Sequence, residues 1–329
     1  MVEPTLRHIL RAHERIAPYI HRTPVLANAT ANKLTGLKLY FKAENFQKTG
    51  TFKARGAING ILSLRERKPN IKGVVTHSSG NHGQALAWAA QQLKLPCSVV
   101  VPENTPIVKI NAVKTYGADV VLSPPTPQDR RMICENLSTE KGYEIIEPFD
   151  NYDVIAGQAT IALELLEEVP DLEAVVVPVG GGGLSAGIAL ATKLSKPSVK
   201  VFMVEPKGKD LAKSMKAGHW LWEGPDRNFV TIADSINRQQ LGKLTWPIVL
   251  KHAESDVLSV EDDEIIQGMK FAFQRLKIVV EAASATGLTA LLTKKLQTIN
   301  PSLQKVGVIV CGGNVDLDHL PWYDSQASR

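Results

Sequence analysis

The sequence predicts an α/β protein with two open, parallel-type twisted sheets flanked by helices. Short runs of β-branched residues alternate with helix-like stretches along the chain. Strands that are apolar throughout and separated by helices are typical of parallel sheets covered on both faces. The chain has 329 residues, more than a single hydrophobic core usually serves. We therefore expect two lobes.

The expected elements follow each other as strand, helix and strand. Met1 to Ile20 places charges among apolar residues in the pattern of an amphipathic helix. Beyond it, apolar β-branched runs predict strands, and the longer mixed stretches between them predict helices. In chain order, these are strand 73–76, helix 82–93, strand 97–101, helix 106–116, strand 119–122, helix 128–140, strand 175–179, helix 184–194, and strands 199–204 and 306–310.

Composition narrows the class of protein. Apolar residues make up 44% and charged residues 22% of the chain, which is ordinary for a folded globular protein. The net charge of +5 comes from scattered basic residues, whereas a nucleic-acid protein more often has a basic stripe with aromatics. No uncharged apolar run approaches the roughly 20 residues that cross a bilayer. We therefore expect no nucleic-acid or membrane partner.

The three cysteines, Cys97, Cys134 and Cys311, cannot complete a disulfide set, and none forms a CxxC pair. Reduced thiols are typical of an intracellular protein. The first twenty residues lack the apolar core of a signal peptide. We therefore expect a cytoplasmic location.

Three predicted strands end in glycine-rich or small polar turns, at 78–81, 180–183 and 311–314. Ligands of parallel sheets bind beyond the carboxyl ends of the strands. At 180–183, four glycines join a buried strand to a helix, where bare N–H groups and the helix start favour a phosphate. Two alternatives stay open: a plain tight turn, and a dinucleotide site. For the latter, Gly181-x-Gly183-x-x-Ala186 with Glu205 fits the nicotinamide-enzyme fingerprint.

The turn at 78–82 offers two hydroxyls, an amide and free helix-start N–H groups, a set that can hold a carboxylate. Simple capping by Ser79 or Asn81 is the alternative, and both can hold together. Lys53 lies in Thr51-Phe-Lys-Ala-Arg-Gly56. Composition and periodicity do not distinguish it from a solvated surface lysine.

Taken in order, the motifs around Lys53, Ser78–Gln84, Gly180–Leu184 and Gly312–Asp316 resemble the serine racemase and serine/threonine dehydratase family. The similarity runs from His21-Arg-Thr-Pro24 to Asp316 and is greatest for the eukaryotic serine racemases. It implies a pyridoxal-phosphate enzyme of fold type II, the tryptophan synthase β-like fold. A large cofactor-binding domain would comprise 1–72 and 151–329, with a small domain at 73–150 that closes over the substrate. It also implies a homodimer.

The resemblance gives each motif a role. Lys53 would carry the cofactor as a Schiff base and move the α proton on one face of a serine-like amino acid. Ser79 would serve the opposite face, which permits racemisation. Elimination to pyruvate and ammonia from serine, or the matching reaction of threonine, needs only the lysine. The cofactor would contact Phe52, Lys53, Asn81, Gly180, Gly181, Gly182, Gly183, Leu184 and Cys311, and the substrate would contact Ser78, Ser79, Asn81 and His82.

The chain departs from serine racemases in four places. Cys311 stands where a serine usually meets the pyridine nitrogen, as in mammalian serine dehydratases. In the family's magnesium site, Glu205 and the carbonyl of Lys209 match two ligands, but Leu211 replaces the second carboxylate. The segments 281–285 and 232–235 also differ from the family pattern. The magnesium site therefore stays open, and so does positive charge from Lys207 or Lys209 in its place.

Two other functions stay open. One is a 3-hydroxyaspartate dehydratase or aspartate racemase, since the same motifs serve those activities. The other is a catalytically inactive homologue that only binds pyridoxal phosphate or an amino acid, which the four departures suggest and the retained Lys53 and Ser79 oppose.

Overall fold

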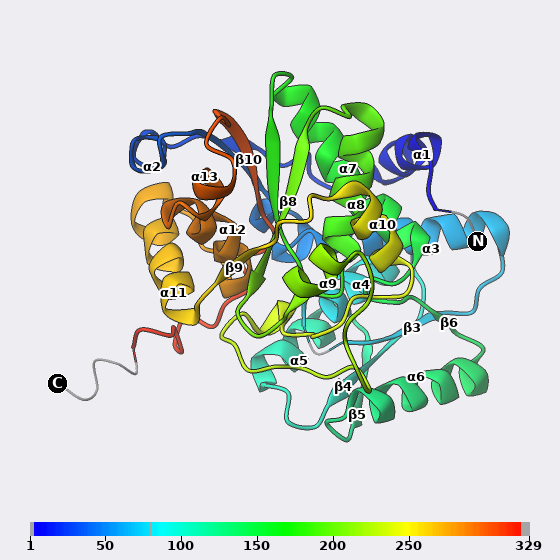
Figure 1. The fold of residues 1–329 in the computed structure, drawn as a ribbon. Coiled ribbons are helices and arrows are strands. Elements are labelled where there is room, and N and C mark those ends of the chain that lie inside the picture. The colour runs from blue at the N-terminus through cyan, green and yellow to red at the C-terminus, as the bar shows by residue number, and fades with distance from the viewer. Residues whose placement is uncertain (1–2, 79, 324–329) are drawn as a thin grey trace.

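The computed structural model describes residues 3–78 and 80–323, which form two sheets with helices on both faces (Figure 1). The six-stranded sheet has the order β1-β2-β10-β7-β8-β9, and only β1 runs antiparallel to its neighbour. Its strands are β1 (Val25–Leu26), β2 (Lys38–Ala43), β7 (Ala174–Pro178), β8 (Lys200–Pro206), β9 (Leu258–Val260) and β10 (Lys305–Val310).

The second sheet has four parallel strands in the order β5-β4-β3-β6. They are β3 (Val74–His77), β4 (Cys97–Pro102), β5 (Asp119–Ser123) and β6 (Glu144–Ile145). These strands lie within 73–150, the range predicted for the small domain. However, the core on one face of this sheet also includes Ile58 and Ile61, which come from earlier in the chain. The domain division therefore stays a prediction.

Helices separate the strands, as the apolar pattern predicts. They are α1 (Leu6–Ile16), α2 (Ala29–Thr35), α3 (Lys53–Arg67), α4 (Asn81–Gln92), α5 (Ile107–Thr115), α6 (Pro127–Lys141), α7 (Tyr152–Glu168), α8 (Gly183–Ser195), α9 (Leu211–Ala217), α10 (Thr245–His252), α11 (Asp262–Phe271), α12 (Ala282–Leu292) and α13 (Lys295–Ile299). Short 3-10 helices lie at Glu44–Phe46, Lys48–Gly50 and Asp234–Ile236, and a π-helical segment at Ala272–Leu276. Every predicted strand and helix has a counterpart within two residues, except the first helix, which is shorter than 1–20.

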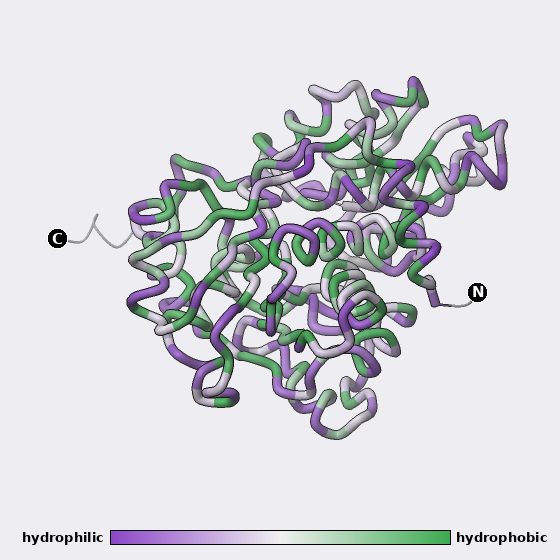
Figure 2. The backbone as a smooth tube through the Cα atoms, turned by 90° about the horizontal axis from the view of Figure 1, so that it is seen from above, coloured by the Kyte–Doolittle hydropathy of each residue, from purple (hydrophilic) through white to green (hydrophobic). Residues whose placement is uncertain are grey.

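Both faces of each sheet are covered. α8 contacts β7 and β8 from one side, and α12 contacts β7 to β10 from the other (Figure 1). In the small sheet, Val74 and Val99 pack towards α4, whereas Val75 and Val100 pack against Cys134 of α6. This alternation explains why the strands are apolar at every position. In Figure 2, hydrophobic and hydrophilic residues alternate along most of the chain, as expected for helices and loops that each have one buried side.

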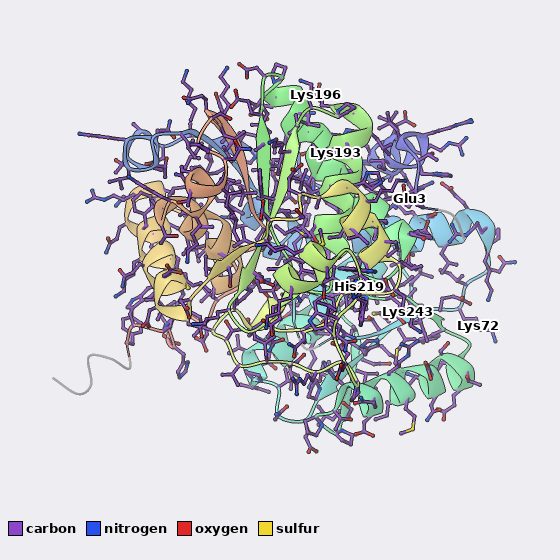
Figure 3. The ribbon with its side chains drawn as sticks, in the orientation of Figure 1. Glu3, Lys72, Lys193, Lys196, His219 and Lys243 are labelled. Carbon is purple, nitrogen blue, oxygen red and sulfur yellow. The ribbon has the colours of Figure 1, made fainter. Side chains whose placement is uncertain are left out.

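Glycines allow the helices between the sheets to approach closely. A Cβ on Gly157 of α7 would lie 2.6 Å from the carbonyl oxygen of Arg55, and one on Gly187 of α8 would lie 2.8 Å from the main-chain nitrogen of Ala159. Helices α3, α7 and α8 therefore form one tightly packed layer. At its edge, Glu3, labelled in Figure 3, pairs with Lys251 of α10 at 3.1 Å and fixes the segment before α1. In the described part of the chain, no helix combines the length and apolarity needed to cross a membrane.

Candidate active site

The carboxyl ends of β3, β7 and β10 open into one cavity of about 1430 Å³. Ordinary ligand pockets measure about 300–1,000 Å³, so this one has room for a cofactor and a substrate together. Most of the residues predicted for the site line it: Phe52, Lys53, Ser78, Asn81, His82, Gly180, Gly181, Gly182, Gly183, Leu184 and Cys311. Ser79, the predicted second acid/base, lies outside the described residues.

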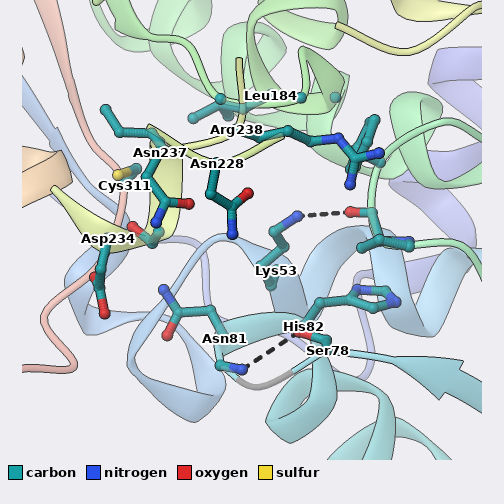
Figure 4. Close-up of a pocket in the computed structure, with 18 of the residues that line it drawn as sticks. Lys53, Ser78, Asn81, His82, Leu184, Asn228, Asp234, Asn237, Arg238 and Cys311 are labelled. Carbon is teal, nitrogen blue, oxygen red and sulfur yellow. Dashed lines mark hydrogen bonds between the residues drawn. The ribbon is translucent and has the colours of Figure 1, made fainter. Parts of the chain in front are cut away.

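Lys53 is the first residue of α3, and its side chain extends into the cavity (Figure 4). The helix start is fixed to the end of β10, because the Phe52 amide donates to the Cys311 carbonyl at 3.0 Å. The Lys53 Nζ donates to the Pro148 carbonyl at 2.6 Å and lies 5.2 Å from the centre of the Phe52 ring. Burial lowers the pKa of Lys53 to about 8, although the nearby Cys311 and Glu281 groups oppose the shift. A neutral amine, and hence a nucleophile, is therefore accessible near neutral pH.

The glycine turn runs from the end of β7 into α8, with Gly182 at φ +98°. Side chains cannot enter this turn, since a Cβ on Gly181 would lie 2.6 Å from the Phe149 ring and one on Gly182 2.5 Å from the Thr245 hydroxyl. The first-turn N–H groups of α8 have no partner within the helix. A bare main-chain cradle at a helix start suits a phosphate group. With the Lys53 amine on the same cavity, the residues fit a phosphorylated aldehyde cofactor.

The turn between β3 and α4 places Ser78, Asn81 and His82 on the opposite wall (Figure 4). His82 is buried with Nε2 3.0 Å from the Ile146 carbonyl, and burial followed by the charge of Lys53 lowers its pKa to about 3. The ring is therefore neutral. Asn81 is held by the protein: its amide nitrogen donates to Glu281 at 2.9 and 3.1 Å, and its oxygen accepts from Asn314 at 3.0 Å.

Cys311 and Glu281 form the end of the cavity below β10. The Cys311 sulfur lies 3.1 Å from the Ser284 hydroxyl, and burial raises the pKa of the thiol, which stays neutral. Glu281 accepts from Ser235 at 3.1 Å as well as from Asn81. Burial raises the pKa of Glu281 to about 7. The sequence shows that Glu281 is present but gives no sign of this network, because Asn81 and Glu281 are 200 residues apart.

Three arginines also line the cavity, Arg130, Arg131 and Arg238, and sequence reasoning assigned none of them a role. Arg130 comes from α6 and Arg238 from the loop before α10, and both line the cavity. Arg238 pairs with Asp226 and lies over the Phe149 ring. Within the described residues, the Nε atoms of Arg130 and Arg238 are buried without a hydrogen-bond partner. Burial lowers the pKa of Arg130, and the Arg238 charge adds to this. Two of the arginines that line the cavity therefore have an Nε donor that makes no hydrogen bond within the described residues.

The predicted magnesium ligands do not line the cavity. The Glu205 carboxylate accepts the Leu211 amide at 2.8 Å and the Ala212 amide at 3.4 Å, while the Lys209 carbonyl accepts the Trp222 indole N–H at 3.0 Å. Leu211 is fully buried and supplies no oxygen. A divalent cation needs six or more oxygen ligands. In the part of the chain that the structure describes, no cluster of three acidic, histidine or cysteine residues could hold a metal, so these residues do not fit one.

The chain is similar over nearly its whole length to proteins of known family. Residues 16–312 match the family model for pyridoxal-phosphate dependent enzymes. A serine racemase of Dictyostelium discoideum is 46% identical, with 97% of this chain and 98% of the relative covered. L-threo-3-hydroxyaspartate ammonia-lyase of Saccharomyces cerevisiae is 42% identical over 96% and 95% of the two chains. The crystal structure of a pyridoxal 5'-phosphate-dependent aspartate racemase has a TM-score of 0.95 and 48% identity, covering 98% of this chain and 99% of that one.

Proposed function

The chain belongs to the family of pyridoxal-phosphate dependent enzymes, and we propose that it racemises serine and eliminates water from serine or threonine to release ammonia. One observation carries the proposal. The Lys53 amine has a carbonyl rather than a carboxylate as its hydrogen-bond partner, and its pKa falls to about 8 in the cavity that also contains the glycine turn. The Dictyostelium relative supports serine as the substrate.

The residues of the cavity would hold pyridoxal phosphate as follows. Gly180–Gly183 and Leu184 would bind the phosphate, Lys53 the aldehyde carbon, and Phe52 would pack beside the ring. The neutral Cys311 thiol is a weak hydrogen-bond partner, which suits an unprotonated pyridine nitrogen. Asn81 would turn to the ring hydroxyl from its present contact with Glu281. The bound cofactor supplies the electron sink that weakens the bond between the α carbon and its hydrogen.

The chain's own groups would then move the proton. The Lys53 amine would take the α proton on one face, since its lowered pKa of about 8 brings the neutral form within reach near neutral pH. Ser78, Asn81 and His82 lie where they would hold the carboxylate. Ser79 would return a proton on the opposite face, which gives racemisation. Loss of the β-hydroxyl needs no second face, so elimination depends on Lys53 alone.

The test is incubation of purified protein with L-serine, measuring D-serine and pyruvate together. We expect both products from the unmodified chain. Ser79→Ala should lose D-serine formation and keep much of the pyruvate formation, because only one reaction needs the second face. Racemisation that persists in Ser79→Ala contradicts the role of Ser79. Serine binding without either product would instead indicate an inactive homologue.

A second candidate is a racemase or dehydratase of aspartate-type substrates. The unpartnered Nε atoms of Arg130 and Arg238 on the cavity wall favour it, because arginine donors suit a second carboxylate. The aspartate racemase and the hydroxyaspartate ammonia-lyase among the similar proteins point the same way. A substrate panel separates the candidates: Arg238→Met should weaken turnover of 3-hydroxyaspartate by about tenfold or more and leave serine nearly unchanged. Arg22→Met, at an exposed ion pair, is the matched control.

We also propose that the range 73–150 forms a small domain that closes on the substrate. Lys109 of α5 supports this, because it pairs at 2.6 Å with Asp234 of the large-sheet region, and both line the cavity. Small-angle scattering should show a smaller radius of gyration with serine than without it.

We further propose that the chain forms a homodimer and is located in the cytoplasm. Light scattering should then give twice the mass of the 35.9 kDa chain, and a tagged chain should stay in the cytoplasm. The three buried cysteines are free, as in reducing compartments.

A further inference from the structure

Lys209 is a fully buried lysine that lies outside the cavity. Lysine is almost never fully buried unless its amino group is paired. Here the Nζ donates to the carbonyl oxygen of Arg238 and, at 3.3 Å, to that of Gln239. The charge of Glu205 also acts favourably on Lys209, although burial lowers the pKa of the lysine to about 7. The amino group therefore joins the end of β8 to a loop 29 residues later in the chain.

The loop that Lys209 holds also contacts the glycine turn. The Gln239 side chain fastens it further, donating to the Gly208 carbonyl at 3.2 Å and accepting from Arg227 at 3.0 Å. Three residues on, the Gly242 amide donates to the Gly181 carbonyl at 3.0 Å, and the Thr245 hydroxyl donates to the same oxygen at 2.8 Å. The hydrogen bonds of the Lys209 Nζ thus position the loop that supports the proposed phosphate site.

The same place in the fold matches the family's magnesium site, which the sequence left open, and each candidate ligand is occupied or absent. The protein uses the oxygens of Glu205 and the carbonyl of Lys209 for its own N–H groups, and Leu211 has no oxygen to offer. Asp210, the adjacent carboxylate, is half-exposed and pairs with Lys213 at 3.0 Å. The group that joins this position to the loop is therefore the Lys209 amino group, which donates to the Arg238 and Gln239 carbonyls.

We propose that the Lys209 amino group, through its hydrogen bonds to the Arg238 and Gln239 carbonyls, positions the loop 238–242 in place of a divalent metal, and that cofactor binding here is independent of divalent metal. Lys209 is a positioning residue: it acts on the cofactor through Gln239, Gly242 and the glycine turn. The inference rests on the pyridoxal-phosphate cofactor but not on which amino acid is turned over. Its tests therefore measure cofactor affinity and thermal stability. The expected results of these tests do not depend on which substrate the enzyme uses.

The first test uses the unmodified holoenzyme. Its thermal midpoint is measured in EDTA, in magnesium and in calcium at constant ionic strength. A metal that binds the folded chain raises the midpoint by mass action, so we expect the three midpoints to agree. A midpoint that rises with magnesium or calcium overturns the proposal, whatever the variants do.

The second test uses Lys209→Ala with Lys207→Ala as the matched control, because Lys207 is exposed and pairs with Glu261 on the surface. Removing the amino group leaves two carbonyls without their donor. We expect the dissociation constant of pyridoxal phosphate to rise about tenfold or more, with no change for Lys207→Ala. Methylammonium should restore the affinity of Lys209→Ala, and sodium at equal ionic strength should not. Unchanged affinity in Lys209→Ala, or failure of methylammonium to restore it, contradicts the positioning role.

The third test rebuilds the metal site by combining Lys209→Ala with Leu211→Asp. Together with Glu205 and the main chain, the new carboxylate restores the predicted oxygen set. We expect magnesium or calcium to raise the thermal midpoint and the cofactor affinity of this double variant only. If magnesium or calcium raises the thermal midpoint of Lys209→Ala as much as that of the double variant, the restored carboxylate is not what binds the metal, and the proposal is contradicted.

Discussion

Lys53 and Arg55 lie two residues apart at the start of α3, yet their surroundings differ. Arg55 is fully buried in a closed network: it donates to Glu44 at 2.8 Å and to Glu164 at 2.6 Å, and Lys42 donates to Glu164 at 2.7 Å. Two cations thus face two carboxylates. The Thr23 hydroxyl completes the set by donating to Glu44 at 2.5 Å.

Lys53 has no such match. Its amino group donates to a carbonyl, and the nearby Cys311 and Glu281 groups do not outweigh burial. The pKa of Arg55 is accordingly raised by Glu44 and Glu164, whereas that of Lys53 falls to about 8. The comparison teaches that burial with matched charge keeps a group ionised and structural. Burial without a matched charge pushes it towards the neutral, reactive form.

The largest expected effect comes from removing the unmatched amine. Lys53→Ala should lower racemisation and elimination by at least about 10³-fold, because the group that attaches the cofactor and moves the proton is gone. The absorbance of the lysine-bound cofactor should vanish too. Circular dichroism should show a folded protein, which separates loss of chemistry from loss of structure. Substantial activity in this variant would remove Lys53 from the reaction.

Removing the matched cation should instead affect stability. Arg55→Met leaves Glu44 and Glu164 facing each other in the core with only Lys42 as counter-charge. Breaking a buried ion pair from one side typically costs about 3–5 kcal/mol. We expect a loss of this size in the free energy of unfolding, measured by urea denaturation of the apoprotein. A loss under about 1 kcal/mol would show that the network is not a structural unit.

The pH dependence of cofactor uptake sharpens the same contrast. An amine attacks an aldehyde only when neutral, and the pKa of Lys53 is lowered from 10.5 to about 8. The rate at which the apoprotein takes up pyridoxal phosphate should therefore rise about tenfold from pH 7 to pH 9 and then level off. A free lysine derivative under the same conditions should keep accelerating above pH 9. A protein rate that also continues to rise would mean that burial does not lower this pKa.

The smallest expected effect comes from an ion pair at the surface. Arg22 and Glu167 approach to 3.0 Å, but their side chains are 50% and 70% exposed. Arg22→Met should change the free energy of unfolding by less than about 1 kcal/mol. The same denaturation series measures it beside Arg55→Met. Similar losses in both variants would show that burial is not what gives the Arg55 network its strength.

Much of the fold follows from local pattern. The glycine turn and the polar turn after β3 sit at strand ends, and parallel strands bring their carboxyl ends to one edge. Ser78 and Asn81 follow β3 of the four-stranded sheet, and Gly180–Gly183 follow β7 of the six-stranded sheet. They line one cavity because the tertiary structure brings these edges of the two sheets together. The partners of Asn81 could not be predicted in the same way. Glu281 and Asn314 contact Asn81 although they are 200 and 233 residues away in the sequence. No local sequence pattern can predict contacts at such separations.

By itself, the sequence determined the alternation of strands and helices, the family, and the residues at each strand end. Those properties depend on the spacing of apolar side chains and on short motifs. Both can be read from one continuous stretch of the chain. Only the tertiary structure decided which cations are matched. It set Arg55 among carboxylates, Lys53 beside a carbonyl, and Lys209 against two carbonyls at the place where the sequence left a magnesium site open. Protonation and charge balance depend on what surrounds a group in space, and folding brings those neighbours from distant parts of the chain.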